Sequence, residues 1–142
     1  MLKVATIILL IMLVFGGVYS LMLIFAPKMI LSSGFEAETG EKLEDIQNAS
    51  YLKVMVGELK HMGVLALAVS ICSIFILFAG FRKAEKWAWW ATLITGNLTW
   101  GYGLIDNIIT GDMFNSLLHL IGIVIFLVGL FIPVKVFFAK EA

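Results

Sequence analysis

Charged side chains are scarce in this sequence. They make up only 14% of the 142 residues, and the formal net charge is +0. A typical soluble domain carries about 25% charged residues, and a protein that binds nucleic acid carries a basic patch. The composition therefore argues against an ordinary soluble domain and against nucleic acid as a partner.

Cysteine and catalytic motifs are missing as well. Cys72 is the only cysteine, which excludes a disulfide within the chain and any cysteine-rich metal site. We interpret it as a small apolar packing residue. The sequence contains no Gly-x-Ser-x-Gly elbow, so nucleophilic catalysis has no support.

Apolar residues are abundant instead. They make up 61% of the chain, and the mean hydropathy is +1.03. Crossing about 30 Å of hydrocarbon takes roughly 17–25 apolar residues in a helix, because a helix satisfies its own backbone hydrogen bonds in lipid. The charge-free runs of this length are Val4–Ala26, Met62–Phe81, Trp87–Ile105 and Met113–Val134. We predict an all-α fold, a four-transmembrane-helix bundle that forms a single integral membrane domain over residues 1–142.

The first run resembles a signal peptide at first sight, because Lys3 precedes it. The apolar core of a signal peptide has about 7–15 residues, and a small-x-small cleavage site follows it. The run Val4–Ala26 is longer, and no clear site of that kind comes before Pro27. We therefore expect a retained first span.

Basic residues in the short segments predict the orientation. Cytoplasmic segments carry an excess of Lys and Arg, and every short basic segment of this chain falls on one side of the predicted bundle. The turn between the third and fourth spans has Asp106 and Asp112 and no basic residue. We predict a multi-pass protein of the cell membrane with both termini in the cytoplasm. The basic residues behind this prediction are Lys3, Arg82, Lys83, Lys86, Lys135 and Lys140.

Tryptophan residues fit the same orientation. Trp87, Trp89 and Trp90 follow the basic turn directly, while Trp100 and Tyr102 mark the opposite boundary. Indole rings favour the headgroup level of a bilayer, so we place these residues at the two membrane surfaces.

Residues 27–61 form the only long segment outside the predicted spans. Pro27 should end the first span, and Ser32–Gly34 should form a turn. Thr39–Gly40 should then begin an amphipathic outer helix over Glu41–Lys60, because apolar residues recur at helical spacing in its second half. This helix either runs straight into the span that begins at Met62 or lies on the outer membrane surface.

The third span is the least lipid-like. Thr92, Gly96, Thr99, Gly103 and Asp106 recur every three or four residues and so share one helix face. Small and hydroxyl residues let membrane helices pack closely. Asp106 stands near the end of the span, so it either reaches water or lines a cavity within the bundle. We expect this face to point into the bundle.

Both histidines fall near the outer boundary. His119 lies roughly 9 Å inside the fourth span, at 1.5 Å per residue. His61 begins the second span, and Glu58 precedes it by one helical turn. The predicted topology gathers these side chains, with Asp112, into one outer-facing polar pocket, or else His119 simply bonds Asp106, Asn107 or a threonine to fix the packing. The candidate ligand-binding residues are Glu58, His61, Thr99, Asp106, Asn107 and His119.

A cofactor is conceivable at the histidines but has no complete motif. His61, His119 and a carboxylate could hold a metal such as zinc, and the two histidines could ligate a haem. A di-iron site needs a second Glu-x-x-His pair, and no glutamate stands near His119. We therefore predict no specific cofactor.

The stretch Met62–Ile132 resembles the DoxX-like group of small four-helix membrane proteins. The resemblance rests on Gly63–Ala68, the basic turn Phe81–Lys83, the acid Asp106 and the segment Leu118–Gly122. It covers about half of the chain and implies a four-helix fold. Members of the group are often accessory membrane components, so the resemblance implies no particular activity.

Three functions are compatible with these features. The first is a non-enzymatic accessory subunit, or a binder of a lipid or small amphipathic ligand in the outer-facing pocket. The second is a metal- or haem-dependent membrane enzyme or redox protein that uses His61 and His119. The third is a small transporter, which would have to act as an oligomer because the first two spans contain no charge. The partners expected are membrane lipid, a small amphipathic ligand, and another membrane protein or a second copy of the chain.

Overall fold

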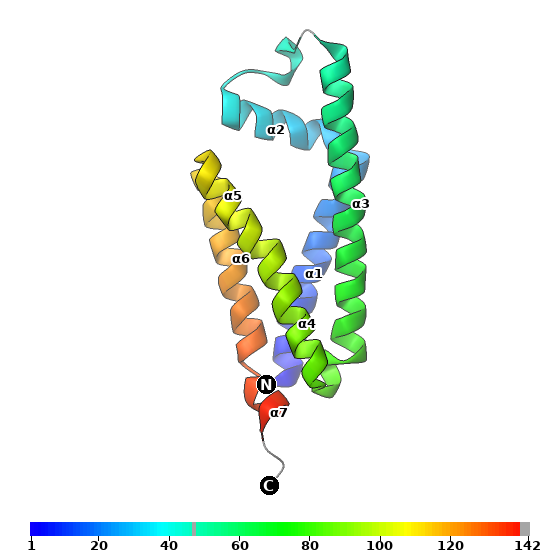
Figure 1. The fold of residues 1–142 in the computed structure, drawn as a ribbon, viewed down its shortest axis with the longest axis vertical. Coiled ribbons are helices and arrows are strands. Elements are labelled where there is room, and N and C mark those ends of the chain that lie inside the picture. Colours follow the sequence, from blue (N-terminus) through cyan, green and yellow to red (C-terminus); the bar gives the residue numbers. More distant parts are fainter. Residues whose placement is uncertain (47, 140–142) are drawn as a thin grey trace. The chain divides into compact units, whose positions relative to one another are not determined.

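A computed structural model of the chain describes residues 1–46 and 48–139, without the side chain of Phe114. The described residues form helices and turns and include no strand, which confirms the all-α prediction. The chain divides into two compact units, and Figure 1 shows the helices that make them up. One unit combines Met1–Val14 with Ile71–Ala142, and the other is Phe15–Ser70.

Two helices are long and apolar enough to cross a membrane. They are α1 (Leu2–Phe25) and α3 (Ala49–Ala79). Only 17% of the most apolar window of α1, and 22% of that of α3, is buried inside the protein. A helix in the core of a soluble protein would be mostly buried, whereas a helix that contacts lipid exposes its apolar side chains. The first two predicted spans thus form helices suited to a membrane.

The helix α2 (Pro27–Thr39) occupies the segment where the sequence predicted a turn. It runs through Ser32–Gly34 without interruption, so that prediction was wrong. The serine hydroxyls bond within the helix, and the Ser33 hydroxyl donates to the Ile30 carbonyl at 3.0 Å. Pro27 suits the first turn of a helix, where no backbone N–H is needed. Gly40 ends α2 with a positive φ of 72°.

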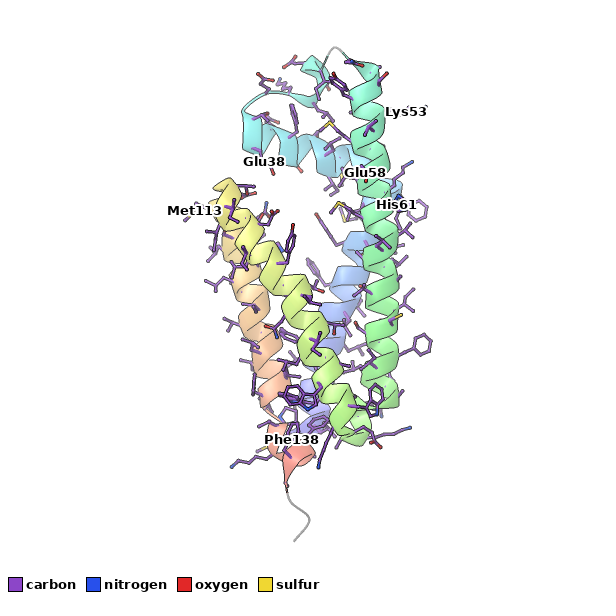
Figure 2. All side chains as sticks on the ribbon, viewed as in Figure 1. Glu38, Lys53, Glu58, His61, Met113 and Phe138 are labelled. Atoms are coloured by element: carbon purple, nitrogen blue, oxygen red, sulfur yellow. The ribbon has the colours of Figure 1, made fainter. Side chains whose placement is uncertain are left out.

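The predicted helix over Glu41–Lys60 is right only in its second half. Between residues 41 and 46 the chain forms one short helix, η1 (Leu43–Asp45), and α3 begins at Ala49. The Asn48 side chain accepts a hydrogen bond from the Ser50 N–H at 3.0 Å, an interaction typical of a helix start. From Ala49 the helix continues without a break into the apolar run at Met62, as one of the two alternatives predicted. Figure 2 labels Lys53, Glu58 and His61 along it.

The third and fourth apolar runs are helical as well. After η2 (Phe81–Lys83), the third run consists of α4 (Lys86–Gly96), the π-helical turn η3 (Asn97–Gly101) and α5 (Tyr102–Thr110). The fourth run forms α6 (Met113–Phe131), followed by α7 (Val134–Phe138). α6 ends before the predicted Val134, because Pro133 has no N–H to continue the helix. Lys140, used above for the orientation, lies outside the described residues.

Trp89 is a core residue rather than a surface residue. Its side chain is 5% exposed, and its indole N–H donates to the Leu130 carbonyl at 3.1 Å. The ring packs edge-on against Phe131 and Phe138. A buried indole needs a hydrogen-bond partner, and the Leu130 carbonyl supplies it here. The depth of Trp89 in the membrane stays a prediction. Trp90, its neighbour, is 52% exposed.

Where the helix of the third apolar run packs against α6, a glycine on one helix faces a ring on the other. A side chain at Gly96 would overlap the ring of Phe126, one at Gly122 would overlap Trp100, and one at Gly103 would overlap His119. Each ring thus occupies the space left by a glycine on the facing helix, so the two backbones approach closely. This packing fixes the register of α5 against α6, which lie side by side (Figure 1). It also positions His119.

Candidate functional site

His119 is the centre of a hydrogen-bonded cluster between α5 and α6. Its Nδ1 atom lies 3.0 Å from the Asn107 amide nitrogen and 2.9 Å from the Asn115 carbonyl oxygen. The same Asn107 nitrogen donates to the Gly103 carbonyl at 2.7 Å, within its own helix. Asn107, Asn115 and His119 are all half-buried. The cluster therefore links the two helices through polar side chains.

The imidazole of His119 has two ways to satisfy Nδ1. When Nδ1 carries no proton, it accepts from the Asn107 amide; when it is protonated, it donates to the Asn115 carbonyl. The Nε2 edge packs against Gly103, and the ring stands edge-on to Trp100 at a centroid distance of 5.8 Å. Packing and hydrogen bonds thus hold the ring in one orientation.

The start of α6 positions this cluster. Asp112 is the N-cap, and its carboxylate accepts the Asn115 backbone N–H at 2.9 Å. The Asn115 side-chain amide donates to the other carboxylate oxygen of Asp112. Such a cap satisfies a backbone donor at the helix end and places negative charge where the helix dipole favours it. Asn115 is held in place as a result, one turn before His119.

Ser116 belongs to the cluster by position, and the sequence interpretation did not include it. Its hydroxyl oxygen is buried and has no hydrogen-bond partner among the described residues. Several other hydroxyls of the chain donate to a carbonyl three or four residues earlier, as Ser20 does at 2.7 Å. The spacing of Ser116 in the sequence could have indicated it as a site residue. Ser116 is four residues after Asp112 and three before His119, which places it on the same helix face.

The structure brings together only part of the predicted site. Of the partners proposed for His119, Asn107 is the one it contacts. Thr99 and Asp106 are exposed, and the Thr99 hydroxyl donates to the Thr95 carbonyl at 2.9 Å. The prediction that this face of the third span points into the bundle was therefore partly wrong. Gly96 and Gly103 point toward α6, but Thr99 and Asp106 do not.

Glu58 and His61 belong to the other compact unit. Both are exposed on α3, three residues apart and hence on one face of that helix (Figure 2). Their convergence with His119 stays a prediction. Among the residues that the structure describes, no three His, Cys, Asp or Glu side chains are grouped so as to hold a metal ion.

Comparisons with known proteins add no identification. No protein-family model, curated protein or solved structure matches this chain. The resemblance to the DoxX-like group stays a prediction. The class that the fold defines is an all-helical protein with two helices able to cross a membrane by length and composition.

Proposed function

We propose that this chain is a four-span membrane protein that binds a lipid or another small amphipathic molecule without catalysing a reaction. In this proposal both termini are cytoplasmic, the layout is that of the DoxX-like group, and the protein acts as an accessory component. The binding site is the cluster of Asn107, Asn115, Ser116 and His119. The observation that carries the proposal is the buried hydroxyl of Ser116, which has no hydrogen-bond partner among the described residues and stands on α6 between Asn115 and His119.

Helix lengths support two further spans. The continuous helix from Lys86 to Thr110 is about 37 Å long, and α6 is about 28 Å long, at 1.5 Å per residue. Hydrocarbon about 30 Å thick fits both. Large apolar side chains are exposed along both helices, including Leu98 at 69% and Leu117 at 55%. Such side chains suit lipid contact better than water.

The polar cluster retains capacity to bind a ligand. Asn107 and Asn115 bond through their amide nitrogens, so each amide oxygen can accept a further hydrogen bond. Ser116 adds a hydroxyl that can donate or accept. Unpaired polar groups in an apolar environment are costly, so a headgroup with hydroxyl or amine donors would stabilise the site. Exposed Ile108 and Leu117 offer surface for its apolar part.

The other functions receive no specific support. A metal or haem enzyme would need His61 and His119 in one site, and Nδ1 of His119 already has two neighbours in its own unit. A transporter would need a charge within the membrane. Both alternatives stay predictions.

Mass spectrometry of the protein purified in a mild detergent tests the proposal. We expect one amphipathic molecule to copurify in stoichiometric amount. After partial removal of the ligand with excess detergent, Ser116→Ala should lower the ratio of occupied to empty protein about fivefold, since one hydrogen bond contributes about 1 kcal/mol. Ser33→Ala removes an exposed hydroxyl of α2 and should leave occupancy unchanged. The absence of any bound amphiphile, or equal occupancy in the Ser116 variant, would contradict the proposal.

A further inference from the structure

A groove in the other unit has the chemistry of an anionic headgroup site. It has a volume of about 280 Å³ and lies between the start of α2 and the first turns of α3. Its apolar wall comes from α3, and one lysine from each helix lines it. The lining residues are Lys28, Ala49, Leu52, Lys53 and Val56. We propose that this groove binds the phosphate of an anionic membrane lipid between the two ammonium groups.

Among the described residues, neither lysine of the groove has a counter-ion. Within residues 1–46 and 48–139, no carboxylate forms an ion pair with Lys28 or Lys53. Neither lysine has an acid three or four residues away on its helix, the spacing at which such pairs form. Two positive charges beside one groove repel each other, and a shared anion removes that repulsion. The charge of the groove thus favours an anionic occupant.

One side of the groove directly follows a helix long enough to cross a membrane. Lys28 follows the end of α1 at Phe25 by three residues, and α1 is a helix able to cross the membrane. A lysine at the end of a span extends its ammonium group to the membrane surface while its methylenes stay on apolar surface. Lys53 lies on the charged part of α3, before the apolar run that begins at Met62.

The apolar wall favours a lipid over a soluble anion. Leu52, Val56 and Ala49 present no hydrogen-bond donor to a phosphate, but they can contact the glycerol backbone and the first methylenes of an acyl chain. Burial of this apolar surface adds to the binding free energy only when the anion carries an acyl chain that can cover it. The occupant is therefore an anionic phospholipid, and this inference is independent of the site between α5 and α6.

Lipid titration of the full chain, monitored by native mass spectrometry, tests the inference. Phosphatidylglycerol should bind at least tenfold more tightly than phosphatidylcholine with the same acyl chains. Each lysine near a membrane surface contributes about fivefold to binding, so the double variant Lys28→Gln/Lys53→Gln should weaken phosphatidylglycerol binding about twenty-five-fold. Lys42→Gln/Lys60→Gln removes the same charge from exposed lysines that do not line the groove, and should weaken binding less than threefold.

Each other outcome overturns the inference in a different way. Equal weakening by both double variants would show that overall charge, not the groove, attracts the lipid. Unchanged binding in Lys28→Gln/Lys53→Gln would exclude the groove as the site. Glycerol 3-phosphate has the anion without acyl chains, and we expect it to compete only at a hundredfold or greater excess. Competition at equal concentration would identify a site for soluble phosphate rather than for lipid.

Discussion

Gly103→Leu is expected to lower the free energy of unfolding by about 3 kcal/mol, the upper part of the range for overpacking a core. A side chain at this position would overlap the imidazole of His119. The neighbouring backbone belongs to packed helices, so α5 would have to move away from α6 or the ring would have to leave its site. Unfolding of the protein in mixed micelles, titrated with sodium dodecyl sulfate, measures the change.

The same helix supplies a matched control for this substitution. A side chain at Gly101 meets no atom within 4 Å, so Gly101→Leu should leave stability within about 0.5 kcal/mol of wild type. In a His119→Ala background the ring is gone, and Gly103→Leu should lose most of its effect, as a double-mutant cycle would reveal. Equal losses in Gly101→Leu and Gly103→Leu would contradict the packing described here.

Asn107→Leu is expected to destabilise the protein by about 2 kcal/mol. The substitution keeps the size of the side chain but removes its bond to His119 and leaves the Gly103 carbonyl without the second donor. A hydrogen bond between membrane helices contributes about 0.6 kcal/mol on average and about 1.7 at most, and the bond from the amide to the Gly103 carbonyl is lost as well. The micelle titration described above measures it.

Asn97 provides the comparison for Asn107. Its amide also donates to a carbonyl four residues earlier, that of Leu93, at 2.8 Å. Asn97 is exposed, and no bond from it to a second helix is found within the described part of the chain. Asn97→Leu should therefore change stability by less than about 0.5 kcal/mol. If both variants are equally unstable, the bond between Asn107 and His119 does not hold the two helices together.

The helices were predictable because apolar run length is a strong signal. Each charge-free run is helical in the structure. The helix α3 begins well before Met62, at Ala49, and the other boundaries are shifted by a few residues. The segment Ser32–Gly34 was not predictable from residue type, since Ser and Gly favour turns. In the structure the serine hydroxyls bond to carbonyls of their own helix instead, so α2 persists. The side chain of Asn48 caps the start of α3. The sequence offered Thr39 and Asn48 as possible helix starts, and residue type alone does not decide between them.

The contacts of His119 were only partly predictable. Asn107 was one of several partners that the helical period allows, and periodicity alone does not choose among them. The packing of rings against glycines selects Asn107 as the partner. Trp100 lies opposite Gly122 and His119 lies opposite Gly103, and these two contacts set the rotation of α5 about its axis. That rotation leaves Thr99 exposed although it shares a period with Gly103. The π-helical turn η3 had no signal in the sequence.

The central claim is that four spans cross the membrane with both termini in the cytoplasm. Single cysteines at Glu38, Lys83 and Thr110, all exposed, can be introduced into a Cys72→Ser background and treated with a membrane-impermeant maleimide. In intact cells we expect labelling at Glu38→Cys and Thr110→Cys, and labelling at Lys83→Cys only after permeabilisation. Labelling of Lys83→Cys and Thr110→Cys from the same side would mean that the helix from Lys86 to Thr110 does not cross the membrane, and it would contradict the four-span account.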